Sequence, residues 1–116
     1  MSERKVELIK PEEAKGRQTS GGGYITFFYQ EQRIVSGTFR MPPKTKLSGK
    51  GPMSHPGDET YYVLKGPAYC DLPDENRTVR IEGAQGLRIP AGTRHTPHNM
   101  PGQHDALVYF LCTDWP

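Results

Sequence analysis

The sequence predicts a single all-β domain, and three observations support this prediction. No stretch of ten or more residues shows the 3.6-residue apolar period of a helix. Short segments rich in aromatic and β-branched residues follow one another closely, separated by turn-forming residues. The 13 glycines and 11 prolines among 116 residues supply many tight turns, and both numbers are high for a helical bundle. Together these features indicate a β-sandwich or β-barrel.

The chain is expected to begin with an accessory strand. Residues 1–20 are polar except at a few positions, notably Val6, Leu8 and Ile9, which predicts one short strand and then a loop around residues 11–16. Gly21-Gly22-Gly23 is expected to act as a flexible hinge. The barrel itself is therefore predicted at residues 21–116.

Seven further strands are predicted from apolar patterns and from the turns that end them. The first is aromatic and β-rich, and residues 30–32 turn the chain into the second. Residues 42–52 form a loop of lysine, glycine and proline that leads directly to His55, so we expect this loop to border a site. The predicted strands are Tyr24–Tyr29, Arg33–Met41, Tyr61–Leu64, Tyr69–Leu72, Thr78–Glu82, Leu87–Ile89 and Leu107–Cys112.

Composition and charge exclude several classes of function. A formal net charge of +2, with no long run of lysine or arginine, argues against a nucleic-acid partner. No apolar stretch approaches the length of a transmembrane helix, and the N-terminus lacks the hydrophobic region of a secretion signal. We therefore expect a cytoplasmic protein without a membrane partner, in which Cys70 and Cys112 are buried free thiols.

Two stretches contain the residues best suited to chemistry. In the first, His55 and Glu59 precede a strand on which Glu59, Tyr61 and Val63 share one face. A glutamate on such a face is costly to bury without a cation, a hydrogen-bond network or a metal. In the second stretch a turn at residues 90–92 is followed by His95. Two histidines and one carboxylate suit a divalent first-row metal ion.

These two stretches resemble the two sequence motifs of the cupin family. The family's first motif is G-x5-H-x-H-x3,4-E-x6-G, and its last three positions are matched by His55, Glu59 and Gly66. Its second motif is G-x5-P-x-G-x2-H-x3-N, and its last four positions are matched by Pro90, Gly92, His95 and Asn99. The chain departs from the family at Met53, where a further histidine is usual, and at Ala84, where glycine is usual.

The resemblance, which spans residues 35–112, implies a double-stranded β-helix, or jelly-roll, barrel in a single domain. It also implies pairing of the N-terminal strand across a homodimer. It implies His55, Glu59 and His95 as ligands of one divalent transition metal, with manganese, iron, nickel, cobalt and zinc all compatible. Because a thioether is a poor ligand for such ions, Met53 leaves one position to water or makes the site degenerate.

The function expected from this resemblance is that of a metal-dependent enzyme. Isomerase, lyase, decarboxylase and dioxygenase reactions are all open, on a small oxygenated organic acid, ketone or sugar-like substrate bound inside the barrel. The alternative is a non-catalytic cupin that binds a small molecule and has a degenerate metal site. Fold alone does not choose between them.

Three other residues have two interpretations each. Tyr61 is the candidate catalytic residue because it shares a strand face with Glu59, and the alternative is a core tyrosine whose hydroxyl is tied up. His98 is predicted to be an exposed loop histidine, with the mouth of the site as the alternative. Asn99 is predicted to tie down its loop through hydrogen bonds to the backbone rather than to contact substrate.

Overall fold

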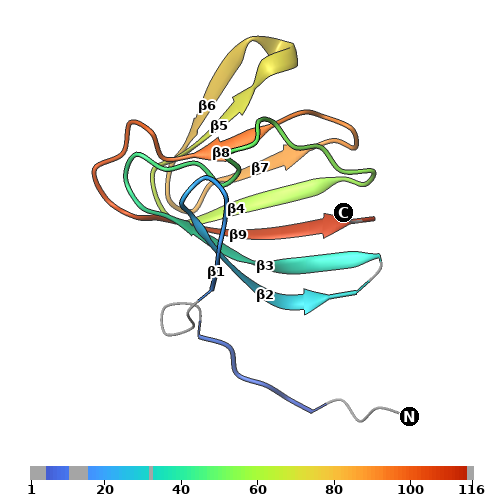
Figure 1. Cartoon of the computed structure of the whole chain (residues 1–116). Helices are drawn as coiled ribbons and strands as arrows, with labels where there is room; N and C mark the ends of the chain where they lie inside the picture. Colours follow the sequence, from blue (N-terminus) through green and yellow to red (C-terminus); the bar gives the residue numbers. More distant parts are fainter. Residues whose placement is uncertain (1–4, 11–15, 32, 115–116) are drawn as a thin grey trace.

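The computed structural model describes residues 5–10, 16–31 and 33–114, and it confirms an all-β architecture (Figure 1). The strands form two antiparallel sheets, one in the order β1-β2-β3-β9-β4-β7 and the other in the order β6-β5-β8. One short 3-10 helix, Pro73–Glu75, joins β5 to β6. The strands are β1 (Arg17–Gln18), β2 (Tyr24–Gln30), β3 (Ile34–Met41), β4 (Glu59–Lys65), β5 (Ala68–Leu72), β6 (Arg77–Ile81), β7 (Gly86–Ile89), β8 (Thr96–His98) and β9 (Ala106–Thr113).

The hydrophobic core lies between the two sheets, and most of its residues are on the inner face of the large one. Strands β3 and β9 pair along eight residues without a register shift, and β9 also pairs with β4. Strand alternation then turns Phe39, Val63, Val108 and Phe110 inward, and each is at most 2% exposed. The first residue of β4, Glu59, lies on this same inner face and is 3% exposed. The core therefore reaches the start of β4, where the candidate residue Glu59 lies.

The loop before β4 is held against the end of β9. The backbone N–H of Thr113 donates to Asp58 O at 3.0 Å. A Cβ at Gly57 would collide with Thr113 O, so only glycine allows this approach of the two backbones. The contact fixes the chain between His55 and Glu59, and so sets the distance between those two side chains.

The predicted strands after residue 20 are all present, most of them extended by a residue or more. One predicted strand is absent, and two short strands were not predicted. Residues 5–10 have no regular secondary structure, and Val6 and Leu8 are largely exposed, so the strand expected around Val6–Ile9 does not form in the single chain. Strand β1, at Arg17–Gln18, and strand β8, at Thr96–His98, were not predicted. Part of the expected N-terminal loop, residues 11–15, lies outside the described residues. Among those described, no helix is long and apolar enough to cross a membrane.

Candidate metal centre

Four buried polar side chains converge at one end of the core, and each comes from a different segment. His55 lies in the loop before β4, Glu59 begins β4, His95 lies just before β8, and Cys112 is on β9. Glu59 is paired across the sheet with Cys112 on one side and with Ile89 on the other. The exposed fractions are 8% for His55, 3% for Glu59, 1% for His95 and 0% for Cys112. The pairing of β4 with β9 therefore fixes this group.

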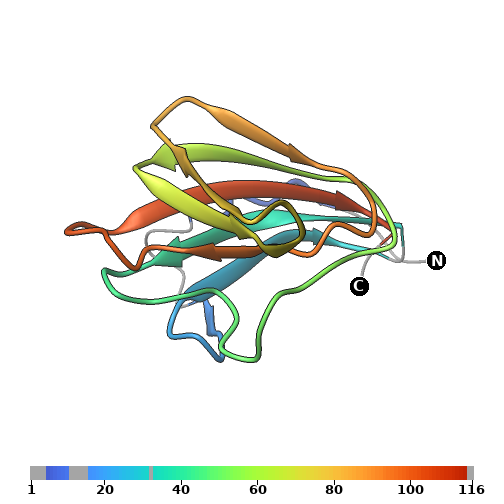
Figure 2. The same cartoon turned by 90° about the horizontal axis from the view of Figure 1, so that it is seen from above.

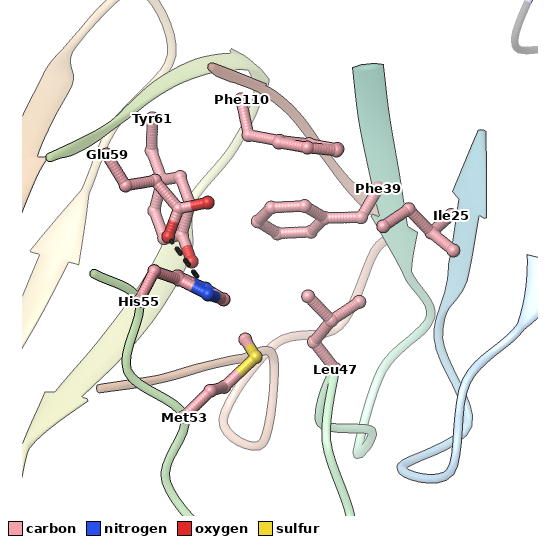
Figure 3. Close-up of a pocket in the computed structure, with 8 residues that line it drawn as sticks. All are labelled: Ile25, Phe39, Leu47, Met53, His55, Glu59, Tyr61 and Phe110. Carbon is pink, nitrogen blue, oxygen red and sulfur yellow. Dashed lines mark ion pairs between the residues drawn. The ribbon is translucent and has the colours of Figure 1, made fainter. Parts of the chain in front are cut away.

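Glu59 is at the centre of the group. Its Oε1 lies 3.0 Å from His95 Nε2 and 3.6 Å from His55 Nε2. Figure 3 shows the carboxylate of Glu59 turned towards the His55 ring, with Tyr61 beside it. The structure thus brings together all three residues that the motif resemblance indicated.

The orientation of His95 indicates that a cation or a proton belongs between His95 and Glu59. His95 Nδ1 lies 2.8 Å from Thr93 O, and a carbonyl oxygen can only accept, so Nδ1 carries a hydrogen. In the neutral ring, Nε2 is then an acceptor, and it faces another acceptor, the Glu59 carboxylate. A backbone carbonyl that fixes the tautomer in this way is typical of metal-binding histidines. The donor set therefore fits a divalent metal ion.

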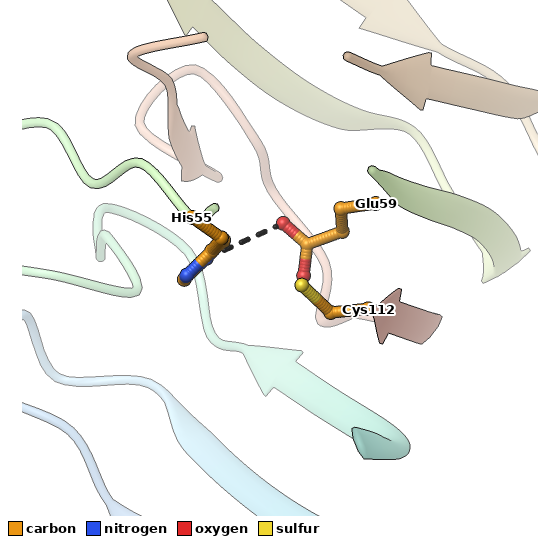
Figure 4. A group of neighbouring side chains, drawn as sticks. All are labelled: His55, Glu59 and Cys112. Atoms are coloured by element: carbon orange, nitrogen blue, oxygen red, sulfur yellow. Dashed lines mark ion pairs between the residues drawn. The ribbon is translucent and has the colours of Figure 1, made fainter. Parts of the chain in front are cut away.

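Cys112 is a possible ligand that the sequence argument missed. Single ligand atoms of His55, Glu59 and Cys112 all lie within 4.8 Å of one another. Figure 4 shows the Cys112 sulfur beside the carboxylate of Glu59, opposite the His55 ring. Burial, together with the nearby Glu59 charge, raises the pKa of the Cys112 thiol to about 12. The alternating pattern of β9 could have placed Cys112 inward, but its pairing with Glu59 could not be inferred from the sequence.

A small cavity lies next to this group and is mostly apolar. It is lined by Ile25, Phe39, Leu47, Met53, His55, Glu59, Tyr61 and Phe110 (Figure 3). The free space is about 20 Å³, roughly enough for one water molecule. Met53 lies at the site through its backbone as well, because it exchanges two hydrogen bonds with His95, Met53 N to His95 O at 2.9 Å and His95 N to Met53 O at 2.8 Å. Met53, where the motif resemblance implied a further histidine, therefore forms part of the cavity wall.

Tyr61 is 3% exposed and lies at the polar end of the cavity. Burial, the Glu59 charge and a hydrogen bond with Glu59 raise the pKa of the Tyr61 hydroxyl well above its usual value. The hydroxyl therefore stays protonated and donates a hydrogen bond to the carboxylate of Glu59. This agrees with a core tyrosine whose hydroxyl is tied up in a hydrogen bond, and the catalytic role of Tyr61 stays a prediction.

The other sequence-based assignments can now be compared with the structure. His98 is 5% exposed and its Nε2 lies 2.9 Å from Asp71 Oδ1, so the prediction of an exposed loop histidine is wrong. Asn99 donates from Nδ2 to Met41 O at 2.9 Å and to His104 O at 2.7 Å, which confirms that it ties down its loop. Cys70 and Cys112 are buried free thiols, as predicted.

Comparison with known proteins supports the fold independently. No protein-family model and no curated protein matches the sequence. Among the many solved structures that match the fold, three illustrate the likeness. The polyketide cyclase RemF from Streptomyces resistomycificus has a TM-score of 0.77 at 18% identity, over 94% of this chain and 80% of that one. An uncharacterized Klebsiella pneumoniae protein with a double-stranded β-helix domain has a TM-score of 0.77 at 13% identity, over 96% and 92%. A cupin superfamily protein from Desulfitobacterium hafniense has a TM-score of 0.68 at 17% identity, over 87% and 82%.

These likenesses, together with the two-sheet topology, establish the fold. The described part of the chain has the double-stranded β-helix fold that these cupin-superfamily and β-helix structures share. The fold prediction is therefore confirmed. Sequence identities below 20% indicate a shared fold but not a shared activity, so the activity has to be argued from the site.

Proposed function

We propose that this chain is a metal-dependent cupin enzyme in which His55, Glu59 and His95 hold one divalent transition metal. Its substrate would be a small oxygenated organic acid, ketone or sugar-like compound, and its setting a cytoplasmic homodimer. One observation carries the proposal: Glu59 Oε1 lies 3.0 Å from one buried histidine nitrogen and 3.6 Å from another. A carboxylate that is 3% exposed and shared by two imidazoles is costly without a cation.

The protein's own residues define what the site can accept. A bound divalent ion would supply a Lewis acid that polarises a carbonyl or carboxylate oxygen of the substrate. Tyr61 holds the Glu59 carboxylate in place by donating to it and keeps its own proton. Phe39, Leu47 and Phe110 wall the cavity with apolar surface, which excludes bulk water. Since the free space of about 20 Å³ holds roughly one water molecule, an organic substrate would reach the site only if these side chains move.

The presence of an enzyme among the structural neighbours is compatible with catalysis. One neighbour is a polyketide cyclase of 18% identity. At this identity the comparison supports a barrel able to carry a reaction, and the reaction itself is left open among isomerase, lyase, decarboxylase and dioxygenase classes.

A non-catalytic cupin that binds a small molecule is the second candidate, and Met53 favours it. The Met53 side chain lines the cavity that also contains His55 and Glu59, in the place of a residue that would add a further nitrogen ligand. If the thioether fills the position that a substrate oxygen needs, an ion could still bind while turnover is lost.

Elemental analysis of protein purified without a histidine tag tests the proposal. We expect about one metal ion per chain in the wild type and a loss of more than about tenfold in affinity for His95→Ala. The matched control is His104→Ala, which removes an exposed histidine outside the group and should keep the metal. A wild type without metal, even after incubation with manganese, iron, nickel, cobalt or zinc, would overturn the metalloenzyme. If the protein binds metal but turns over none of a panel of small hydroxy acids, ketones and sugars, the second candidate, a non-catalytic cupin that binds a small molecule, is favoured.

A further inference from the structure

We infer that Cys112 is a further ligand of this ion, bound as a thiolate beside His55 and Glu59, and that it favours zinc, cobalt or iron(II) over manganese. The inference rests on the metal site proposed above and concerns a residue outside the two sequence motifs. On binding, the thiol would give its proton to solvent and a sulfur–metal bond would form, with no change of oxidation state.

The geometry is the first argument. Glu59 and Cys112 are directly paired across β4 and β9, and both side chains point to the inner face. One ligand atom each of His55, Glu59 and Cys112 fits within a span of 4.8 Å. Ligand atoms that lie about 2.0–2.3 Å from a common ion are separated by distances of this order or less. A small adjustment of side chains therefore brings nitrogen, oxygen and sulfur to one ion.

Charge balance is the second argument. The site is enclosed, since His55, Glu59 and Cys112 are each at most 8% exposed. A divalent ion held by one carboxylate and neutral imidazoles would leave one uncompensated positive charge in this interior, which is costly. A thiolate supplies the second negative charge. The neutral combination of one carboxylate, one thiolate and a divalent ion suits a buried position.

Burial alone would not distinguish Cys112, because cysteine is among the most commonly buried residues. Cys70 provides the comparison, since it is also 0% exposed and also a free thiol. The cross-strand partners of Cys70 are Val79 and Pro97, whereas a partner of Cys112 is the carboxylate-bearing Glu59. The chain thus contains one core cysteine whose strand partners are apolar and one that is paired with a candidate metal ligand, which provides a matched control.

Thiolate ligation changes which metals bind. Soft sulfur ligands favour zinc, cobalt(II) and iron(II), whereas manganese(II) prefers oxygen. With Cys112 engaged, zinc should bind far more tightly than manganese. Replacement of the sulfur by oxygen should narrow the zinc-to-manganese affinity ratio by at least about tenfold.

The experiment is a cobalt(II) titration of the metal-free full chain, followed by absorption spectroscopy. The wild type and Cys70→Ser should both show a near-ultraviolet sulfur-to-cobalt charge-transfer band at one cobalt per chain. Cys112→Ser should lack the band and bind cobalt more than about tenfold more weakly, as for loss of a metal-site residue. Circular dichroism verifies the fold of each variant, and the wild-type spectrum tests the inference even if Cys112→Ser does not fold.

The outcomes separate this inference from the proposed function. Cobalt binding by the wild type without the band, and with equal affinity in Cys112→Ser, would overturn Cys112 as a ligand and leave the site of His55, Glu59 and His95 intact. A band that disappears in Cys70→Ser and persists in Cys112→Ser would also overturn it. No binding of cobalt or zinc by the wild type would overturn both this inference and the proposed metal site.

Discussion

Glu59 determines the properties of the site at the scale of single residues. Its carboxylate is buried, pairs with two histidines and accepts from Tyr61. The same carboxylate is a source of instability when no cation is bound, because a buried charge facing the acceptor Nε2 of His95 is unfavourable. Metal affinity and the stability of the metal-free protein are therefore expected to change in opposite directions when this residue is neutralised.

We predict this opposite change for Glu59→Gln. The amide can donate to His95 Nε2 and still accept from Tyr61, so the unfolding free energy of the metal-free protein should stay equal or rise by about 1–2 kcal/mol. Metal content should fall, since the amide carries no charge. Urea unfolding measures the change in stability, and elemental analysis measures the change in metal content. Glu82→Gln, on an exposed ion pair with Arg80, is the control and should change stability by less than about 1 kcal/mol. A Glu59→Gln variant that is less stable and keeps its metal would contradict the prediction.

Asn99 serves the fold rather than the chemistry. It is 0% exposed, and its Nδ2 joins Met41 O to His104 O, so one amide holds two segments together. Asn99→Ala should lower the unfolding free energy by about 2–4 kcal/mol, since it removes both donors to buried carbonyls.

Asn99→Asp should be worse than Asn99→Ala near neutral pH, because an ionised carboxylate would face those carbonyls without a donor. The midpoints of urea unfolding rank the three proteins. An aspartate variant as stable as the wild type would show that the amide nitrogen is not the group that matters.

Some of the residues of the candidate site could be predicted from the sequence, and others could not. Motif spacing pointed to His55, Glu59 and His95, which the structure places close together, because short spacing within a loop or strand is local information; their role as metal ligands stays a prediction. Cys112 and the burial of His98 were missed because each depends on a distant strand: Cys112 is paired with Glu59 on β4, and His98 with Tyr69 on β5. Pairings of this kind are set by the whole fold and leave no local pattern.

At the scale of elements, the join between β2 and β3 depends on one glycine. The register of this pair shifts between Phe27 and Tyr29, and Gly37 lies opposite Phe27. A Cβ on Gly37 would collide with Thr26 O, so Gly37→Ala should cost about 1–3 kcal/mol in unfolding free energy. Gly83→Ala is the control, with no heavy atom within 4 Å of the added Cβ and an expected change within about 0.5 kcal/mol. If Gly37→Ala and Gly83→Ala change the thermal unfolding midpoint equally, this account of the register shift between β2 and β3 is contradicted.

The small sheet contains a hydrogen-bonded carboxylate that links β5 to both of its neighbours. Asp71 Oδ1 accepts from Thr78 Oγ1 at 2.6 Å and lies 2.9 Å from His98 Nε2. The Met100 backbone N–H donates to His98 Nδ1 at 3.1 Å, so Nε2 carries the hydrogen in the neutral ring. Partial burial would raise the pKa of Asp71, but the hydrogen bonds from Thr78 and His98 outweigh it and lower that pKa below its usual 3.8.

This shift predicts how stability depends on pH. A carboxylate whose folded pKa is lowered stabilises the protein above its unfolded pKa, and that stabilisation is lost as pH falls through the folded value. Asp71→Asn should therefore lower the unfolding free energy at neutral pH, by less than about 1 kcal/mol because the side chain is 45% exposed. The gap from the wild type should close below about pH 3.8. A gap that widens in acid, measured by urea unfolding across pH, would contradict this assignment.

Sequence reasoning at this scale succeeded where a strand carries its own signal. The alternation of Val79 and Ile81 and the aromatic run from Tyr24 predicted β6 and β2 correctly. Strand β8 was missed because its three residues, Thr96-Pro97-His98, look like a loop and are strand only through pairing with β5. The apolar Val6, Leu8 and Ile9 suggested a strand, but a strand also needs a neighbour, and the described chain provides none at residues 5–10.

At the scale of the whole molecule, the outer face of the large sheet carries several exposed apolar side chains. Ile34 on β3, Tyr62 on β4 and Leu111 on β9 are 44%, 45% and 37% exposed. On the same face the rings of Phe28 and Tyr109 lie 6.2 Å apart. Figure 2 shows the strands of this sheet running side by side across the molecule. Exposed apolar surface grouped on neighbouring strands is typical of a contact surface.

The homodimer implied by the family resemblance stays a prediction, and this face gives it a test. The wild type should elute with twice the chain mass in size-exclusion chromatography with light scattering. Tyr62→Lys combined with Leu111→Lys should give a monomer at micromolar concentration, since two charges on the packed face are costly to bury. Met100→Lys is the matched control, because Met100 is 40% exposed on the turn between β8 and β9 and should leave the dimer unchanged. A monomeric wild type would contradict the dimer itself, and a dimeric double variant would move the contact away from this face, with residues 1–10 as the next segment to delete.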